Sequence, residues 1–238
     1  MSPPRSLTLD LHVHTNYSHD GHDSVEKIVD SAISKNLDGI AICDHDTMNG
    51  SYAAQKYVAD NELDLIIIPG IEVTTAKGHL IVLGMEEGIA KGLSPGETIR
   101  IARQREKKNS TVVIIAPHPY HPFRHSIGNL CVHPELDIDA IEIYNSRYFS
   151  GVANEIARRK AARRNITAVA GSDAHSAECV GLATVEVDVE IEQQSEQKML
   201  LDATLSGIKE GKVKIKSCEK TPFWTYFKQL FFSTLLPY

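Results

Sequence analysis

Histidines and carboxylates stand together at several places in the chain, and their types and spacing could hold metal ions. The segments are Asp10-Leu11-His12-Val13-His14, Asp44-His45-Asp46, Glu72 followed by His79, His118-Pro119, and Asp173-Ala174-His175. Each comes after apolar, largely β-branched residues, a pattern typical of buried strands. Mixed nitrogen and oxygen ligands suit several divalent transition metals. We therefore expect strands to deliver these side chains to one site that binds more than one ion.

Two segments share a spacing of two residues between possible ligands. Side chains two apart in a strand point to the same side, so His12 and His14 can bind one ion. Asp173 and His175 repeat this spacing near the other end of the chain. A pair of surface histidines is the alternative for His12 and His14 taken alone, and the repetition argues against coincidence.

Glu72 follows an apolar run that ends in Gly70, where a tight turn would let the carboxylate reach inward. Its two oxygens can bridge two cations, a role that an imidazole cannot fill. Taken alone, such a glutamate is more often a solvated surface group. His79 is a weak candidate by itself, because a core or surface histidine would look the same.

His45 and His118 are placed by their neighbours in the sequence. Asp44 and Asp46 flank His45, and an aspartate there could fix the tautomer of a ligating ring. His118 lies between two prolines, whose rigid backbone would hold the imidazole in place. Both are therefore candidate metal ligands.

Strand-like and helix-like segments alternate along the chain, which predicts a parallel α/β domain. We expect strands over residues 7–13, 37–43, 65–69, 79–83, 111–116, 140–144, 167–170 and 182–187, and helices over 24–35, 49–61, 95–108, 151–164 and 192–209. The candidate ligands follow early, middle and late strands and must still converge. A βα barrel, which gathers its site at the carboxyl ends of the strands, satisfies that requirement better than an open sheet.

Two regions depart from this alternation. Residues 120–137 are polar and rich in histidine and proline, and we expect a loop over the site. We place the barrel in residues 1–216 and an aromatic tail in residues 217–238. The tail could pack on the barrel, form a subunit contact in a homo-oligomer, or lie on a membrane surface.

Composition narrows the class of protein. The chain has 238 residues, 42% of them apolar and 24% charged, as in an ordinary globular protein. The net charge of −6 gives no general attraction to nucleic acid, although a site holding several dications would attract phosphate locally. The four cysteines form no C-x-x-C pair, and we see no signal peptide or membrane-spanning run, so we expect a cytoplasmic protein.

Taken together, the motifs resemble those of the PHP (polymerase and histidinol phosphatase) family. The resemblance runs from about residue 7 to residue 187, in order, through Asp10 to Thr15 with Tyr17-Ser18, Asp44 to Thr47, Gly70 to Glu72, Ala116 to Pro119, and Gly171 to His175. It implies a distorted (β/α)7 TIM-like barrel with a di- or trinuclear metal centre at the carboxyl ends of the strands. The implied activity is hydrolysis of phosphate esters.

The resemblance also implies which residues hold each ion. His12, His14, Glu72 and Asp173 would hold the first ion, Glu72, His79 and His118 the second, and Asp20, His45 and His175 the third. His19 is the alternative to Asp20, because the two are adjacent. Glu142 could contribute from a strand end near the site, although a strand-end acid without such a role is as good an interpretation. The ions could be zinc, manganese or iron.

In the implied reaction, a metal-activated hydroxide attacks a phosphate ester in line with the leaving oxygen. We assign direct roles in catalysis to Glu72, Asp173 and His175, and phosphate binding to Arg124 and Arg147. A nucleotide, a sugar phosphate or a short oligonucleotide would suit as substrate, without a stable nucleic-acid partner. Histidinol-phosphate phosphatase activity and a non-catalytic, metal-stabilised module of a larger complex are the alternatives.

Overall fold

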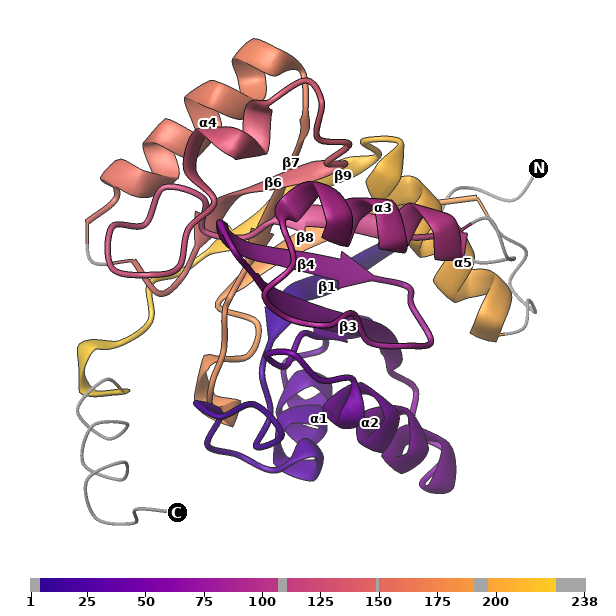
Figure 1. Ribbon diagram of the computed structural model, residues 1–238. Coiled ribbons are helices and arrows are strands. Elements are labelled where there is room, and N and C mark those ends of the chain that lie inside the picture. Colours follow the sequence, from indigo (N-terminus) through magenta and orange to yellow (C-terminus); the bar gives the residue numbers. More distant parts are fainter. Residues whose placement is uncertain (1–4, 107–110, 149, 191–196, 226–238) are drawn as a thin grey trace.

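A computed structural model describes residues 5–106, 111–148, 150–190 and 197–225. In these residues one sheet runs in the order β7-β6-β5-β4-β3-β2-β1-β8-β9 (Figure 1). Its strands are β1 (Arg5–Val13), β2 (Gly39–Ile42), β3 (Ile66–Thr75), β4 (Gly78–Leu83), β5 (Val113–Ala116), β6 (Ala140–Asn145), β7 (Thr167–Gly171), β8 (Ala183–Val189) and β9 (Val213–Cys218). Strands β1, β2 and β3 are parallel, as are β5, β6 and β7, whereas β4 and β8 run antiparallel to both of their neighbours.

The sheet curves until β1 and β7 approach each other at their carboxyl ends. The His14 amide donates to the carbonyl of Ala174 at 2.8 Å, and the Ala174 amide donates to the carbonyl of His12 at 3.3 Å. This bridge nearly closes the barrel and confirms the predicted TIM-like architecture. It also sets the two ends of the candidate site, His12-Val13-His14 and Asp173-Ala174-His175, side by side.

Four helices cover the outside of the sheet: α1 (Val25–Ser34), α2 (Asn49–Asp60), α3 (Pro95–Glu106) and α4 (Val152–Arg164). Helix α5 (Gln197–Lys209) instead packs against the apolar cluster that strands β1 to β8 share. The start of α3 has the reciprocal hydrogen bonds of a capping box, because the Ser94 amide donates to the Glu97 carboxylate and the Glu97 amide donates to the Ser94 hydroxyl. Two short 3-10 turns, η1 (Gly128–Val132) and η2 (Ala177–Cys179), interrupt the loops after β5 and β7.

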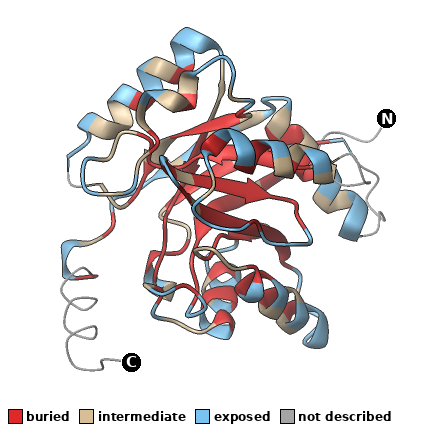
Figure 2. Cartoon of the chain, viewed as in Figure 1, coloured by how far each residue is buried: buried red, intermediate tan, exposed pale blue. Residues whose placement is uncertain are grey.

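The strands are largely buried, whereas the helices each have an exposed side (Figure 2). Buried apolar side chains form three clusters that match this arrangement. Leu7, Leu9 and Leu11 of β1 belong to the cluster that includes Leu205 and Ile208 of α5. A second cluster joins the β3–β6 strands to α3 and α4, and a third joins β1 and β2 to α1 and α2. Burial of each leucine stabilises the folded state by about 1.5–3 kcal/mol. The clusters therefore hold the strands and the residues at their ends in place.

The described sheet has nine strands and not the seven of a (β/α)7 barrel, and β4 and β8 pair antiparallel where a parallel domain was expected. Two strands also differ individually from the sequence-based expectation. Strand β9 was not predicted, although Val213, Ile215 and Ser217 alternate with lysines as in an edge strand with one covered face. Strand β3 continues to Thr75, well beyond residue 69, because it pairs with β4 from Gly70 to Thr75. The first residues of the expected helix over 192–209 lie outside the described residues, and α5 is described from Gln197.

The described part of the C-terminal tail lies against two loops at the carboxyl ends of the strands. The Thr221 amide donates to the Ser146 carbonyl at 3.0 Å, and the Thr225 hydroxyl donates to Glu178 at 3.0 Å. Phe223 and Trp224 remain largely exposed. Residues 226–238 of the expected tail lie outside the described residues. Among the described helices, none is long and apolar enough to cross a membrane.

Candidate metal centre

The carboxyl end of β1 brings two buried imidazoles to one point. The Nε2 atoms of His12 and His14 lie 3.0 Å apart, and both side chains are almost fully buried. Asp173, which follows β7, places Oδ1 at 3.7 Å from His12 Nε2 and 3.6 Å from His14 Nε2. The three ligand atoms form a compact group that could hold one ion.

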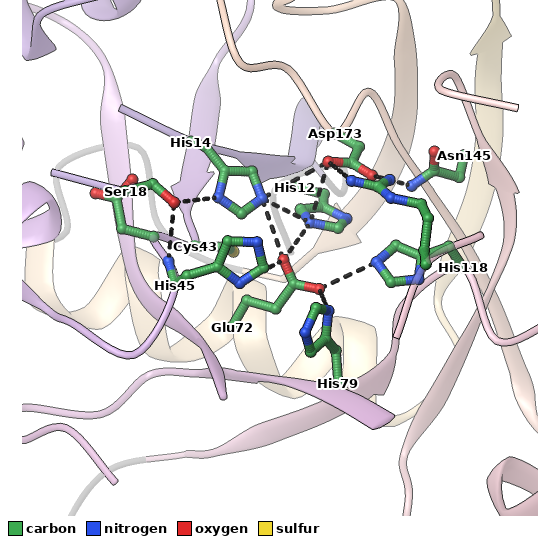
Figure 3. A network of polar contacts seen from close by, with 12 residues as sticks. His12, His14, Ser18, Cys43, His45, Glu72, His79, His118, Asn145 and Asp173 are labelled. Carbon is green, nitrogen blue, oxygen red and sulfur yellow. Dashed lines mark hydrogen bonds and ion pairs between the residues drawn. The ribbon is translucent and has the colours of Figure 1, made fainter. Parts of the chain in front are cut away.

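Glu72 lies at the centre of the site and directs its two oxygens to different histidines (Figure 3). Oε2 is 3.2 Å from the Nε2 atoms of both His12 and His14. Oε1 is 2.9 Å from His79 Nδ1 and 3.1 Å from His118 Nε2. The extension of β3 and its pairing with β4 explain this geometry, because they carry Glu72 and His79 on paired strands.

A further group gathers beside this one. Asp20 Oδ2 is 2.7 Å from His175 Nε2 and 3.7 Å from His45 Nε2, and His14 completes the group. The His19 side chain is exposed and belongs to none of the four groups of ligand atoms found among the described residues. Asp20, and not the adjacent His19, is therefore the residue that joins His14, His45 and His175 in this group.

The donor atoms fit divalent metal ions. The four groups, each with ligand atoms within 4.8 Å of one another, are His14, Asp20, His45 and His175; His12, Glu72 and His118; His12, His14 and Asp173; and His45, Glu72 and His79. His79 and His118 both face Glu72 but fall in different groups, so the expected set of Glu72, His79 and His118 is not found as one group. The Nδ1 atoms of His45, His79 and His118 are buried without a hydrogen-bond partner in the described part of the chain. His79 Nδ1 approaches Glu72, but the ring is not aligned for a hydrogen bond. Unsatisfied buried nitrogens are costly, and a bound cation would satisfy such atoms.

The two aspartates beside His45 do not fix its tautomer, contrary to the sequence-based interpretation. Asp44 accepts hydrogen bonds from the Thr15 amide at 2.6 Å and the Thr15 hydroxyl at 2.7 Å. Asp46 accepts from the Thr74 amide at 2.7 Å. These two carboxylates therefore tie the segment after β2 to Thr15, which follows β1, and to Thr74 of β3.

Strand β6 supplies two buried polar residues behind the candidate ligands. Glu142 Oε1 lies 2.9 Å from His12 Nδ1, and Asn145 Nδ2 donates to Asp173 Oδ2 at 2.8 Å. The sequence singled out Glu142 only as a possible contributor and did not identify Asn145. Their position at the end of the apolar β6 strand was the available signal.

The sequence of this chain also matches a known protein family. Residues 10–210 match the model of the PHP domain. The chain belongs to the PHP family. That assignment agrees with the barrel, with the order of the motifs and with the convergence of histidines and acids at the strand ends.

Curated relatives of this PHP chain cover different shares of it. An uncharacterised protein of Methanocaldococcus jannaschii is 35% identical over 164 residues, which are 65% of this chain and 91% of that protein. The phosphoribosyl 1,2-cyclic phosphate 1,2-diphosphodiesterase of Eggerthella lenta is 35% identical over 85 residues, 33% of this chain and 31% of that enzyme. The 5'-3' exoribonuclease Rnm of Salmonella typhimurium is 34% identical over 113 residues, 47% of this chain and 37% of that enzyme. The matches thus span about a third of the length of either enzyme.

Solved structures share the fold. PsfC from Pseudomonas syringae has a TM-score of 0.72 at 15% identity, covering 98% of this chain and all of that one. A two-domain protein from Bacteroides vulgatus, whose name includes a PHP-like metal-dependent phosphoesterase, has a TM-score of 0.68 at 16% identity and covers 90% of this chain and 66% of that one. At these identities the likeness supports the architecture alone.

Burial sets the charge of most histidines in this PHP site. It lowers the pKa of His14 to about 3, and it lowers the pKa values of His118 and His175 with help from the nearby charges of Arg124 and Arg147. These rings are neutral near pH 7, which is the form that binds a metal ion.

His12 is the exception among the buried rings. Burial disfavours its imidazolium form, but the carboxylates of Glu142 and Glu72 outweigh that effect and raise the pKa of His12 to about 9. Burial also opposes ionisation of Glu72, yet the surrounding histidines, led by His45 and His12, hold the pKa of its carboxyl well below the usual range. At neutral pH the site therefore holds a negatively charged Glu72 carboxylate beside a positively charged His12 ring.

The two arginines predicted to bind phosphate lie beside the site. Arg124 pairs with Asp173, with Nη2 donating to Oδ1 at 3.2 Å and Nη1 contacting Oδ2. Burial and the neighbouring Arg147 charge lower the pKa of Arg124 to about 10, so it stays cationic at neutral pH. The Arg147 amide donates to Asn145 Oδ1 at 2.9 Å, so the Arg147 backbone lies next to the Asn145 side chain that contacts Asp173.

Proposed function

We propose that this PHP chain hydrolyses a phosphate ester at the centre built around Glu72. The observation that carries the proposal is the division of the Glu72 oxygens between the His12–His14 pair and the His79–His118 pair. A carboxylate so placed can hold two cations at a fixed separation. The proposed ligands of the first ion are His12, His14, Glu72 and Asp173, those of the second are Glu72, His79 and His118, and those of the third are Asp20, His45 and His175.

Divalent ions in such a centre acidify water and neutralise charge on the phosphate and the leaving oxygen. The chain's own residues orient the reaction. His175 Nδ1 lies 2.9 Å from the Asp173 carbonyl and its Nε2 faces Asp20, so the ring is held from both sides. Arg124 and Arg147 supply cationic donors for the phosphate oxygens beside Asp173 and His175.

The names of the relatives favour a phosphodiester in a nucleotide or short oligonucleotide as the first substrate class to test. One relative is named as a cyclic-phosphate diphosphodiesterase and another as an exoribonuclease. Both names describe cleavage of a phosphate diester. A sugar phosphate or histidinol phosphate would require monoester hydrolysis at the same ions.

Hydrolysis of matched esters tests the proposal. Bis(p-nitrophenyl) phosphate, p-nitrophenyl phosphate, histidinol phosphate and a short 5'-phosphorylated RNA would each be incubated with the full chain and added Mn²⁺ or Zn²⁺. We expect turnover of the diester or RNA, abolition by a chelator, and a loss of more than about 100-fold in Asp173→Ala, because a direct ligand should cost more than an outer contact.

Two results would contradict the proposal. Turnover that survives both chelation and Asp173→Ala would place the reaction outside this centre. Bound ions without turnover of any of the four esters would favour the non-catalytic module.

A further inference from the structure

Asn145 uses both N–H donors and the oxygen of its side-chain amide in hydrogen bonds inside the protein. Nδ2 donates to Glu142 Oε2 at 2.9 Å and to Asp173 Oδ2 at 2.8 Å, while Oδ1 accepts from the Arg147 amide at 2.9 Å. The residue is buried. An aspartate could not donate either bond, and its charge would face two other carboxylates.

Glu142 is bound just as fully. Oε1 lies 2.9 Å from His12 Nδ1, and Oε2 accepts from the His118 amide at 2.6 Å as well as from Asn145. The backbone of Gly171 packs closely here, since a Cβ atom at that position would lie 2.6 Å from Glu142 Oε1 and 2.5 Å from His12 Cβ. The carboxylate therefore has a single fitted position.

We propose that Glu142 and Asn145 are positioning residues that aim the ligand atoms of His12 and Asp173 at the first ion. With Glu142 accepting at Nδ1, the proton of a neutral His12 ring stays on that nitrogen and the Nε2 lone pair faces His14 and Glu72. With Asn145 holding Oδ2 of Asp173, the other oxygen, Oδ1, faces His12 and His14.

The contacts are specific to one side of the centre. Glu142 and Asn145 bind His12, the His118 backbone and Asp173, and none of the hydrogen bonds described for their side chains reaches Asp20 or His45. Loss of the pair should weaken the first group, and through His118 the second, more than the group formed by Asp20, His45 and His175. A cluster that served only to stabilise the fold would lower the melting temperature without such selectivity.

Metal titration of the full chain tests the proposal without any substrate. Asn145→Ala, the isosteric Asn145→Leu and Glu142→Gln would be titrated with Mn²⁺ by calorimetry against a competing chelator, and bound ions counted by native mass spectrometry. We expect the ions of the first and second groups to bind about 10–100-fold less tightly than in the wild type. The control is Asn129→Ala, because Asn129 is an exposed asparagine whose Oδ1 only accepts a bond from Tyr120.

A second background identifies the affected group. Asp20→Ala should weaken the third group, so any further loss on adding Asn145→Ala must arise at the first or second. Wild-type ion affinity and count in folded Asn145 and Glu142 variants would overturn the proposal, even with a lower melting temperature. If Asn145→Ala fails to fold by circular dichroism, Glu142→Gln, which keeps the side-chain volume, decides the outcome in the same way.

The titration separates this proposal from the proposed function. It needs only Mn²⁺, so the absence of esterase activity would leave it standing. Retained ester turnover with unchanged ion affinity in the variants would overturn it while leaving the phosphoesterase proposal intact.

Discussion

His12 has a carboxylate at each ring nitrogen, Glu142 at Nδ1 and Glu72 at Nε2. The raised pKa of about 9 means that the ring is cationic at neutral pH before an ion binds. An ion cannot coordinate His12 Nε2 until the proton on that nitrogen leaves. Metal binding and proton release should therefore be coupled at this residue.

We expect metal binding near pH 7 to release a proton, and the affinity to rise with pH until about the His12 pKa of 9. The stability of the metal-free fold should depend on pH in the opposite direction. The folded-state pKa of His12 lies above the ordinary value of 6.5. The stabilisation from charged His12 is therefore complete below pH 6.5 and is lost as pH rises through about 9. Calorimetry in buffers of different ionisation enthalpy measures the released proton. A binding enthalpy independent of buffer at pH 7 would contradict this coupling.

Glu72→Gln tests the bridging role of the central carboxylate. Glutamine keeps the shape and one oxygen but loses the negative charge that two cations would share. We expect two ions to bind less tightly, each by more than the roughly 10–100-fold typical of losing a residue that only contacts a metal ligand. Native mass spectrometry across a Zn²⁺ titration measures the count. Loss of a single ion, with the others unchanged, would show that Glu72 binds only one.

Residue types explain which parts of the centre could be predicted from the sequence. His12 with His14 and Asp173 with His175 could be predicted because each pair has residue types that bind metals. Each pair also has the two-residue spacing of a strand, so a segment of five residues or fewer carries both signals. Asn145 escaped prediction because an amide is a poor metal ligand and one of its partners, Asp173, is 28 residues away in the sequence. The roles of Asp44 and Asp46 were wrong because their carboxylates accept hydrogen bonds from Thr15 and Thr74, partners that are distant in the sequence.

At the scale of elements, close packing of β7 against β1 limits what the site tolerates. Gly171 ends β7, and its missing side chain leaves the space that His12 and Glu142 occupy. The positions of two strands thus depend on one residue without a Cβ atom.

Gly171→Ala should destabilise the fold by about 1–3 kcal/mol, because the added methyl group would overpack a region where neighbouring atoms lie closer than 3 Å. It should also weaken metal binding by displacing His12. Gly151→Ala is the matched control, since an added Cβ there meets nothing within 4 Å and the backbone φ is −63°. Urea unfolding and Mn²⁺ titration measure both effects. Equal stability of the two variants would contradict the packing argument.

The sequence predicted most elements but missed two features of the sheet. The apolar runs of the buried strands and the capping box at Ser94 were unambiguous local signals. Strand β9 lies at the sheet edge with lysines on alternate positions, which resembles a polar loop when no partner strand is considered. The length of β3 depends on its pairing with β4, a tertiary contact that an apolar run ending at Gly70 does not reveal.

For the whole molecule, the candidate ligands come from most of the barrel. They lie on, or in the segments after, β1, β2, β3, β4, β5 and β7. Ions that bind only the folded arrangement would therefore cross-link these strands at one end of the barrel and stabilise the entire sheet.

Removal of metal should lower the melting temperature. An ion at 100 times its dissociation constant stabilises the folded state by about 2.7 kcal/mol. For a domain of this size, each kcal/mol shifts the melting temperature by about 2–4 °C, so we expect a loss of roughly 5–10 °C for one ion. Thermal unfolding with and without a chelator measures it. Identical curves would mean that the ions add nothing to the folded barrel.

The barrel as a whole followed from the order of the motifs, since ligands from both ends of the sequence had to meet. The closing contact itself, between the backbones of His12, His14 and Ala174, could not be predicted from either segment alone.

That contact sets an order of events during synthesis. His12, His14 and Glu72 leave the ribosome early, but the first group stays incomplete until Asp173 emerges and Ala174 seals the seam beside β1. A nascent chain halted before that point would carry His12, His14 and Glu72 without the Asp173 carboxylate. Complete loading with metal must therefore wait until the greater part of the polypeptide has been translated.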